Sequence, residues 1–498
     1  MGPNRAAGLL LHRRPASAGA AATARPARLI PVPPPPLRSP HHGVLVRVAI
    51  VGSGISGLGC AHLLGPLHDV VLYEADDRLG GHSNTVTVDD PDVGPLGIDT
   101  GFIVHNDRNY PHLVRLLDEL GVTTVDTEMS FAVTDRPTRF SYRATNLDTL
   151  LADRSNLLDR RLWRMVIDIL RFHRQGRRIL ADADADRSDS DSGPSGGAGP
   201  AGGAGPIGGT STDVGVGVGV GVGVGPTIGE LIRSGRYSDA FVDLHLVPMG
   251  AAVWSADPAT FDRFPARSLL RFLDNHGLLS IGNRPQWRAI VGGSRCYVDA
   301  IAERFTGTIR LATPVTAVER TSDGVAVTAN ATTERYDHVI LAAHSDQTLR
   351  LLVDPTPAEK EVLGAVAYQA NRATLHTDTS VLPPARRAWA AWNYERLGPD
   401  QSQAVLTYDL TTLQRLPGPT RYLVSLNSDV HIDPASVIAS FDYHHPVFDT
   451  AAIEAQRRLA DLNGNNGTWL CGAWTGYGFH EDGMASAVQV ARALGARW

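Results

Sequence analysis

The sequence predicts an α/β fold built around a Rossmann-like dinucleotide-binding domain, with an α+β substrate domain interleaved between its parts. Three observations carry this prediction. A strand, a glycine-rich turn and a helix follow one another in residues 47–64, a strongly apolar strand recurs at 336–343, and a strand followed by a helix occupies 468–494. We assign all three stretches to the dinucleotide-binding domain.

The first of these stretches has the glycine spacing of a phosphate-binding turn. Its strand runs into the sequence GSGISG, and a second strand ends on Glu74. Gly52 allows the tight turn, Gly54 lets a pyrophosphate approach the backbone, and Gly57 lets the helix pack closely on the strand. The helix N-terminus offers unpaired N–H groups to phosphates. Glu74 stands about twenty residues past the first glycine, where an acid binds ribose hydroxyls, so we expect a ligand here.

Composition bounds the class of protein. The 498 residues have a formal net charge of -6, which gives no reason to expect nucleic acid as a partner. Three scattered cysteines without metal spacing favour a reducing, cytoplasmic location and no metal site. No run of about eighteen apolar residues indicates a membrane span. Lys360 is the only lysine of the chain.

Changes of pattern divide the chain into units. Residues 1–46 contain arginines but no acids, and we expect a disordered extension or a start codon placed too early, with a targeting segment as the alternative. Residues 181–226 pass from Ala-Asp to Val-Gly alternation and predict a flexible insertion, with a ligand-covering lid as the alternative. The other units are 47–130, 281–345 and 466–498 for the dinucleotide-binding domain, and 131–280 (mostly helical) and 346–465 (sheet and helices) for the substrate domain.

Further elements follow from periodicity and from turn residues. Helices are expected at 111–120, 157–180, 228–231, 241–247, 269–273, 297–305, 451–462 and 484–494, and strands at 309–318, 324–328, 404–408, 422–426 and 468–473. Residues 131–156 show no clear period and carry no prediction.

Seven motifs are spread over the chain: VGSGISGL (51–58), YEADDRLGGHSNTV (73–86), IDTGFIVHN (98–106), WRAIVGGSRCYVDAI (287–301), TPVTAVER (313–320), VILAAHSDQTLRLL (339–352) and LCGAWTGYGFHEDGMASAVQVARAL (470–494). Together they resemble the superfamily of FAD-dependent amine oxidases and phytoene desaturases, and most closely a bacterial subfamily of predicted FAD/NAD-binding oxidoreductases. The resemblance implies FAD bound in an extended form across the parallel sheet.

The resemblance also implies which residues hold the FAD. From the pyrophosphate through the adenosine to the isoalloxazine ring and back along the C-terminal segment, they are Gly52, Gly54, Ser56, Gly57, Glu74, Ala75, Gly81, His82, Gly101, Phe102, Val315, Gly472, Asp482, Gly483 and Met484. The chain departs from many relatives at two of these places. Ala473 stands where an acid often follows the last glycine, and His82 stands where some relatives have an arginine.

The reacting face of the flavin is expected beside the sequence GAWTGYGFHED, which contains the candidate catalytic residues Trp474, Tyr477, His480 and Glu481. The aromatic side chains could wall a pocket, and an imidazole with a pKa near roughly 6.5 suits acid or base work. The alternative is that His480 and Glu481 merely cap the final helix.

Three further places are candidates outside this sequence. His105 and Asn106 form a second pair that could act near the flavin. Residues 392–394 (Trp-Asn-Tyr) could line the substrate cavity or belong to the core. For His276 a capping or core role is expected.

Three functions remain open from the sequence. The first is an FAD-dependent oxidoreductase that transfers hydride between the flavin and an apolar, fatty-acyl or isoprenoid-like substrate, as a desaturase or saturase. The second is an amine or amino-acid oxidase producing peroxide, which is disfavoured because Lys360 lies in a polar helix and relatives place a lysine near flavin N5. The third is a flavin-binding protein without turnover. With a lipid substrate, we expect peripheral contact with a membrane.

Overall fold

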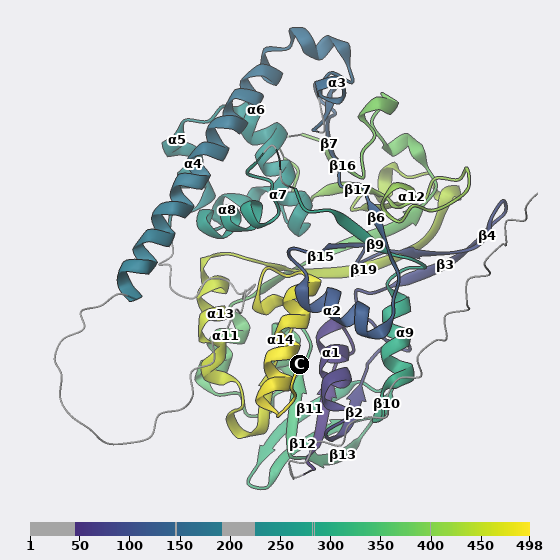
Figure 1. Ribbon diagram of the computed structural model, residues 1–498, viewed down its shortest axis with the longest axis vertical. Helices are drawn as coiled ribbons and strands as arrows, with labels where there is room; N and C mark the ends of the chain where they lie inside the picture. The colour runs from purple at the N-terminus through teal and green to yellow at the C-terminus, as the bar shows by residue number, and fades with distance from the viewer. Residues whose placement is uncertain (1–44, 145–146, 192–224, 281, 283, 399) are drawn as a thin grey trace, which may run out of the picture. The chain divides into compact units, whose positions relative to one another are not determined.

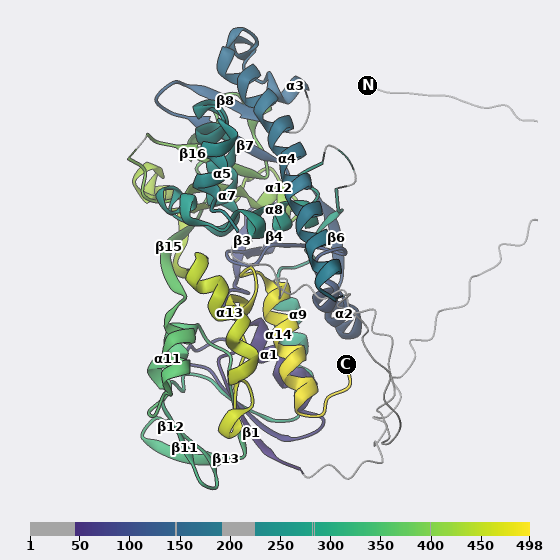
Figure 2. The same ribbon diagram turned by 90° about the vertical axis from the view of Figure 1, so that its left-hand side faces the viewer.

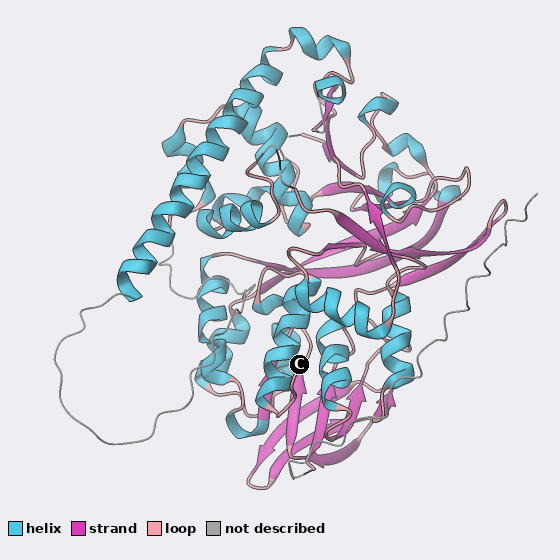
Figure 3. Cartoon of the chain, viewed as in Figure 1, coloured by secondary structure: helices cyan, strands magenta, loops and turns pink. Residues whose placement is uncertain are grey.

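The computed structural model describes residues 45–144, 147–191, 225–280, 282, 284–398 and 400–498. The predicted α/β architecture is confirmed. A parallel sheet covered by helices makes up one part, and a larger, mostly antiparallel sheet with its own helices makes up the other (Figure 3).

The nucleotide-binding part is organised by a five-stranded parallel sheet. Its strand order is β10 (Thr308–Arg310), β2 (Asp69–Tyr73), β1 (Arg47–Val51), β14 (His338–Leu341) and β20 (Thr468–Leu470). Neighbouring strands such as β1 and β14 lie far apart in the sequence, which is why the substrate domain is interleaved between them. The strands read as near-continuous apolar runs because both faces of a parallel sheet are covered.

Alternate residues of β1 face two different layers. Val48 and Ile50 pack with α1 (Ile55–Leu64), α2 (Pro111–Leu120), α9 (Arg295–Arg304) and α14 (His480–Ala493), which contact one another side by side (Figure 1). Ala49 and Val51 face the opposite way. They pack against the three-stranded sheet of β11 (Val315–Thr321), β12 (Gly324–Ala329) and β13 (Thr332–Tyr336), and against α11 (Pro357–Gly364) and α13 (Thr450–Leu462). This division follows from the two-residue period of a strand.

The substrate part is organised by a seven-stranded sheet. Its order is β19 (Val437–Val447), β15 (Ala367–His376), β18 (Leu423–Leu426), β17 (Val405–Asp409), β16 (Trp392–Arg396), β7 (Phe131–Asp135) and β8 (Phe140–Arg143). Two small sheets connect the parts: β3 (Thr85–Asp90) with β4 (Gly94–Asp99), and β5 (Val104–Asn106) with β9 (Trp287–Ile290) and β6 (Thr124–Thr127). Residues 131–143, which have no clear period in the sequence, are thus strands of the large sheet.

A group of helices packs beside this sheet. They are α4 (Arg160–Asp191), α5 (Ile228–Gly235), α6 (Asp239–Phe241), α7 (Val247–Trp254) and α8 (Ala266–Asn275), with α3 (Leu147–Leu150) and α12 (Leu410–Leu413) nearer its strands and α10 (Ser345–Leu351) beside α11. Figures 1 and 2 both show α4 running along the outside of this group.

Several element boundaries differ from the prediction, and two of these differences change an assignment. The last helix begins at His480 rather than at Met484, so His480, Glu481 and Asp482 form its first turn. The helix α4 continues to Asp191, so residues 181–191, predicted as the start of a flexible insertion, are helical. The alanines at 181, 183 and 185 have the highest helix propensity, which favours continuation of the helix into this stretch.

Other predictions fall outside the described residues. These are the proposed insertion over 192–224 and the extension over 1–46, except for Leu45 and Val46. None of the described helices combines the length and the apolar character needed to cross a membrane. Among the described residues, no group of three or more His, Cys, Asp or Glu side chains could hold a metal ion.

Candidate functional site

A cavity of about 840 Å³ lies at the carboxyl ends of β1, β14 and β20 and continues among the helices of the substrate part. This is the edge at which open α/β sheets bind their ligands. Of the residues assigned from the sequence, those that line the cavity are Gly52, Gly54, Ser56, Glu74, Gly81, His82, Gly101, Phe102, Gly472, Trp474, Tyr477 and His480.

Three glycines of the first turn have three different surroundings. Gly52 has a φ of 98°, and a Cβ there would lie 2.8 Å from the carbonyl oxygen of Ala342. At Gly57 a Cβ would lie 1.8 Å from the carbonyl oxygen of Gly52, so only glycine lets α1 pack on this turn. A Cβ at Gly54 would meet no atom of the described residues within 4 Å. The turn therefore closes on itself at Gly52 and Gly57 and leaves Gly54 open to the cavity.

The start of α1 is built to receive an anion. Gly54 is its N-cap, and no side chain of the described residues caps it and no acid stands in its first turn. Ile55 and Ser56 are buried and line the cavity, so the free N–H groups of this turn face an enclosed space. Buried N–H groups require a partner, and the pyrophosphate of a dinucleotide supplies one. Gly54 and the uncapped turn thus fit FAD.

Glu74 stands at the end of β2 on the cavity wall. Its Oε2 accepts a hydrogen bond from the Ser53 N–H at 2.8 Å, and its Oε1 accepts one from the Asp76 N–H at 3.0 Å. These bonds fix the carboxylate beside the glycine turn, where it can still accept from a ribose hydroxyl. Ala75, in contrast, is exposed and is not part of the lining.

The glycine pair brings a second backbone against the first turn. A Cβ at Gly81 would lie 3.3 Å from the Cα of Gly54, so the two glycines face the same space. His82 stacks on Tyr443, with 4.8 Å between ring centroids. Burial, reinforced by His445 and His344, lowers the pKa of His82 well below its usual value, so its imidazole is neutral. His82 is therefore not a cationic substitute for the arginine of some relatives.

Besides Gly57 and Ala75, four residues assigned to FAD lie outside the cavity lining. Val315 begins β11 and is half-buried. Gly483 packs against the start of α1, since a Cβ there would come within 2.7 Å of Ile55 and 2.9 Å of the Ser56 Oγ. The Met484 side chain is fully buried in the core between α1 and α14.

Asp482, the fourth of these residues, caps the helix it belongs to. Its Oδ2 accepts from the Phe479 N–H at 2.9 Å, while its Oδ1 is buried without a partner among the described residues. Burial raises the pKa of Asp482 to about 7. This carboxyl holds the first turn of α14 in place beside the cavity wall.

His480 belongs to a closed hydrogen-bonded group. Its Nε2 lies 2.9 Å from the Ser83 Oγ and 3.1 Å from the Tyr297 hydroxyl, and its ring lies flat on that of Phe102. Burial lowers the pKa of His480 to about 3, so the imidazole is neutral near pH 7. The geometry assigns His480 to shaping the cavity wall rather than to the acid or base role predicted for it.

Glu481, predicted to be a catalytic residue, lies in the core and is not part of the cavity lining. Its side chain points away from the cavity lining and is 2% exposed. Oε1 accepts from the N–H of His112 at 3.0 Å and contacts the Nδ1 of the same residue at 2.6 Å, and Oε2 accepts from the N–H of Leu113 at 3.0 Å. Both oxygens are used to cap α2, so Glu481 ties this helix to α14.

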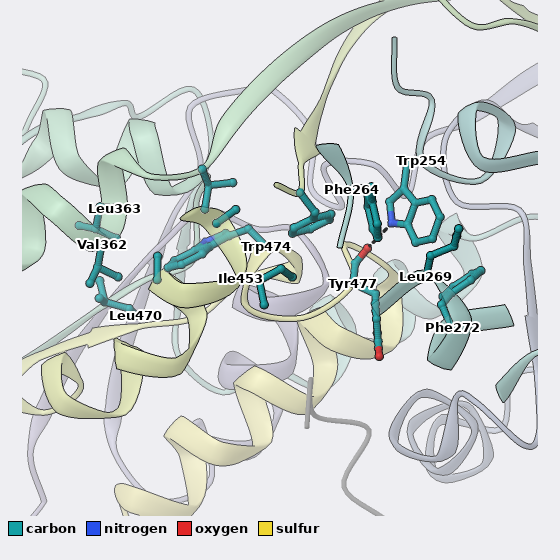
Figure 4. Close-up of a cluster of buried hydrophobic side chains, with 14 of the residues drawn as sticks. Trp254, Phe264, Leu269, Phe272, Val362, Leu363, Ile453, Leu470, Trp474 and Tyr477 are labelled. Carbon is teal, nitrogen blue, oxygen red and sulfur yellow. Dashed lines mark hydrogen bonds between the residues drawn. The ribbon is translucent and has the colours of Figure 1, made fainter. Parts of the chain in front are cut away.

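Trp474 and Tyr477 belong partly to the core and partly to the cavity wall (Figure 4). The Trp474 indole donates to the carbonyl oxygen of Ala343 at 3.2 Å, which ties the last strand to β14. The carbonyl oxygen of Tyr477 accepts from the Trp254 indole at 3.0 Å, as the dashed line in Figure 4 shows. This bond joins the C-terminal segment to the helices of the substrate part.

Of the remaining candidates from the sequence, some line the cavity and others are buried in the core. His105 and Asn106 are fully buried outside the lining, so they do not form a second reactive pair. Of residues 392–394, Trp392 lines the cavity, whereas the other two side chains are buried within the sheet. His276 both lines the cavity and bonds the Phe272 carbonyl through Nδ1 at 2.8 Å, at the end of α8.

Much of the cavity wall was not predicted from the sequence. One such residue, His245, lies in a π-helical turn, Val242–Leu246. Pro248 has no N–H for the carbonyl of Leu244, and the hydroxyl of Tyr142 donates to that carbonyl instead, at 2.9 Å. The signal in the sequence was a proline after the run VDLHLV. The other residues come from separate helices and strands, and no local pattern marks them.

Charge in the lining is confined to two places. Among the described lining residues, Glu74 is the only acid and Arg284 the only lysine or arginine. Arg284 is exposed, so it stands where the cavity meets solvent. The lone lysine, Lys360, is exposed on α11 and is not part of the lining, as its polar surroundings in the sequence predicted.

Comparison with protein families gives two matches. Residues 50–120 match the NAD(P)-binding Rossmann-like domain, and residues 236–494, about half of the chain, match the flavin containing amine oxidoreductase family. Amine oxidase [flavin-containing] A of Sus scrofa is 32% identical over 143 residues. That match covers 28% of this chain and a quarter (25%) of the relative's length.

Two solved structures share the fold over nearly the whole chain. The fatty acid isomerase of P. acnes that produces CLA has a TM-score of 0.61 at 14% identity, covering 90% of this chain and 98% of that one. The cyclohexylamine oxidase of Brevibacterium oxydans IH-35A has a TM-score of 0.59 at 17% identity, covering 90% and 99%. At these identities the likeness concerns the fold.

Proposed function

Because the chain belongs to the flavin-containing amine oxidoreductase family, whose members are FAD-dependent oxidoreductases, we propose that it transfers hydride between the flavin and an apolar acyl-lipid substrate. This proposal covers both the introduction and the removal of a double bond in the acyl group of the lipid. When bound, FAD supplies a centre that accepts or donates hydride, and the protein supplies position, electrostatics and exclusion of water.

The observation that carries the proposal is the character of the cavity beyond the nucleotide. Its walls there are mostly aliphatic and aromatic, with neutral histidines between them. The apolar residues are Met129, Phe131, Ile169, Leu170, Met249, Val253, Trp254, Phe272, Leu278, Trp287, Trp392 and Phe479. Such a wall gains free energy by removing a long hydrocarbon chain from water, and it offers few partners to a small polar substrate.

The histidines of this wall are compatible with an apolar substrate because they carry no charge. Burial lowers the pKa of His245 to about 3 and that of His276 to about 4. The hydrogen bonds from His245 Nδ1 to the Tyr142 hydroxyl and from His276 Nδ1 to the Phe272 carbonyl fix both rings. They therefore shape the wall without adding charge to it.

The rim of the cavity suits the polar head of a lipid. Arg284 is exposed there, and its charge acts on His173, whose pKa is lowered to about 4 chiefly by burial. A guanidinium at the rim attracts a carboxylate or a phosphate, whereas an alkylammonium substrate would be repelled. A lipid whose head group is held at Arg284 would extend its acyl chain inward along the apolar wall of the cavity.

An amine oxidase is the second candidate function. The similarity to amine oxidase A over 143 residues favours it. Against it stand the absence of any acid among the described residues of the apolar wall and the position of Lys360, exposed on α11. The similarity in fold favours neither function, since a fatty acid isomerase and a cyclohexylamine oxidase share it to the same degree. A flavin-binding protein without turnover is the third alternative.

One experiment separates these functions. The purified yellow protein is mixed anaerobically with cell lipids fractionated into free fatty acids, phospholipids and isoprenoids, and its visible spectrum is followed. We expect one lipid class to bleach the flavin, or the chemically reduced flavin to be reoxidised by it. Bleaching by primary or secondary amines, with peroxide formed in air, would contradict the proposal, and a flavin that no fraction changes would indicate the third alternative.

A further inference from the structure

An unusual number of apolar side chains is exposed at the start of α4. Five of the fourteen large apolar side chains that are exposed in the described residues lie between residues 157 and 170. They are Leu157 (53% exposed), Leu158 (88%), Trp163 (38%), Ile167 (55%) and Leu170 (47%). Single exposed apolar residues need no explanation, but a contiguous group of them marks an interaction site. We call these five residues the α4 face.

The α4 face is held in one arrangement. Trp163, Ile167 and Leu170 are spaced by four and three residues, so they lie along one side of the helix. The Trp163 indole donates to the carbonyl oxygen of Leu157 at 2.9 Å and so joins the preceding turn to the helix. Figures 1 and 2 show α4 running along the outside of the helical group.

Arginines flank the α4 face, and acids are nearly absent from it. Between residues 157 and 180 the sequence holds seven arginines and two acids, Asp159 and Asp168, and Asp159 forms an ion pair with Arg161. Asp168 is fully buried and accepts hydrogen bonds from Arg171 and from the N–H and hydroxyl of Ser238. Arg160 and Arg174 are exposed beside the apolar stripe. The surface is therefore apolar at its centre and positively charged at its edges.

The α4 face is continuous with the mouth of the cavity. Leu170 belongs to the face and also lines the cavity, and Ile169 and His173 on the same helix line it too. Arg284, exposed at the rim, acts electrostatically on His173, so it stands close to this helix. The cavity thus opens beside an apolar, cationic surface.

We propose that the α4 face docks on an anionic lipid bilayer. Its apolar side chains would enter the interface, and the arginines would meet anionic head groups, a combination that holds proteins on membrane surfaces. Continuity with the cavity would let an acyl chain pass from the bilayer to the cavity without crossing water. This last step rests on the proposed function, whereas the docking itself does not.

A second copy of the chain is a less suitable occupant. A symmetric dimer through this face would bring the same rows of arginines together across the interface, which is unfavourable. The bilayer, in contrast, supplies both an apolar interior and the negative charge that the arginines require. A dimer formed through this face is therefore the alternative that the experiment below must distinguish from docking on a bilayer.

Vesicle flotation of the full, FAD-loaded chain tests the docking. Vesicles contain either equal parts of phosphatidylglycerol and phosphatidylcholine or phosphatidylcholine alone. We expect the protein to float with the anionic vesicles and to be released by salt. Replacing Ile167→Glu and Leu158→Glu together should weaken binding at least about tenfold, since neither charged side chain can enter the interface. Val353→Glu, an equally exposed apolar residue on another surface, is the matched control.

The arginines are tested separately. Arg160→Ser and Arg174→Ser should each weaken binding to the anionic vesicles by about fivefold and leave binding to neutral vesicles unchanged. A chain that floats with neither vesicle, or an Ile167→Glu/Leu158→Glu variant that floats as the original does, would overturn the proposal. So would a dimer in light scattering that this variant converts to a monomer.

Measurements on the same samples distinguish a failure of the docking proposal from a failure of the proposed function. If the protein binds anionic vesicles but none of their lipids changes the flavin spectrum, docking stands and the lipid substrate does not. If detergent-dispersed lipid bleaches the flavin while vesicle binding is absent, the substrate stands and docking fails.

Discussion

The imidazole of His480 lies flat on the phenyl ring of Phe102, with 3.7 Å between the ring centroids and 8° between the planes. Phe102 lies in the loop between β4 and β5, and His480 opens the last helix, so this contact joins the N-terminal and C-terminal sides of the cavity. Two flat rings stacked in this way form a rigid wall. They also keep water from the imidazole, which is why its pKa falls so far.

We expect His480 to remain neutral throughout the pH range of activity. Its pKa is lowered to about 3 by burial, so its ¹⁵N chemical shifts should not change between pH 5 and pH 8, near the usual imidazole value of about 6.5. The His480→Asn variant identifies the signal and should leave the shape of the pH profile of turnover unchanged. A change of turnover with pH near about 6.5 that is present in the original protein and absent from the variant would show that His480 acts as an acid or base.

The two glycines at the start of α1 should respond differently to alanine. Gly54→Ala fits the fold but places a methyl group where the cofactor belongs, so we expect a folded, colourless protein. Gly57→Ala brings a Cβ within 1.8 Å of the Gly52 carbonyl and should prevent folding. Flavin absorbance per chain and the melting temperature measure both effects. A yellow Gly54→Ala protein with normal flavin content would contradict the cofactor position.

Glu481→Ala should destabilise the protein without removing the flavin. The substitution leaves the N–H groups of His112 and Leu113 without their acceptor, which costs about 2 kcal/mol in the free energy of unfolding. Urea unfolding measures this cost. Glu361→Ala, which removes the exposed partner of Arg458, is the control and should leave stability nearly unchanged. A normally stable Glu481→Ala protein that has lost turnover would return Glu481 to catalysis.

Asp482→Asn should stabilise the protein increasingly as the pH rises. The pKa of Asp482 is raised by burial from 3.8 to about 7, so between these values the folded chain binds a proton that the unfolded chain has released. Its contribution to stability therefore falls as the pH rises through this window. We expect the variant to gain up to about 4 kcal/mol relative to the original chain at neutral pH and nothing at pH 4.

The control for this prediction is Asp69→Asn, an exposed carboxylate on β2. Unfolding is followed in the flavin-free protein over the whole pH window, so that cofactor binding does not enter. A difference between Asp482→Asn and the original chain that is the same at every pH would show that the carboxyl is charged in the fold.

Arg284→Ala should weaken the binding of anionic lipids. Loss of one cation at the rim is expected to raise KM for a fatty acid or phospholipid by about fivefold, with kcat unchanged, because the charge lies far from the reacting atoms. Arg335→Ala, on β13 away from the cavity, is the control. A fall in kcat without a change in KM would contradict the role of Arg284.

The nucleotide side of this site could be predicted from the sequence because its parts are local. The turn from Gly52 to Gly57 and the acid at Glu74 lie within one βαβ unit, and their spacing alone defines the geometry. The role of Glu481 could not be predicted in this way. Its partners on helix α2, His112 and Leu113, lie 369 and 368 residues away in the sequence. No pattern near Glu481 indicates that its carboxylate caps another helix.

The apolar side of the cavity was missed for the same reason. Trp254, Phe272 and Trp287 come from α7, α8 and β9, and each sits in a segment typical of ordinary core, whereas Trp392 on β16 was among the predicted candidates for the lining. Their convergence depends on the order of strands in the large sheet and on the packing of helices against it. Distant pairings of this kind leave no periodicity in a single sequence.

The strand order of the parallel sheet determines when FAD can bind during synthesis of the protein. β1 and α1 leave the ribosome early, but β1 must wait for β14, and β14 must wait for β20 and α14. Until then the nascent chain exposes an apolar strand edge and cannot enclose FAD. Flavin capture is therefore a late event, and chaperones that shield this edge should decide how much of the newly made protein becomes yellow.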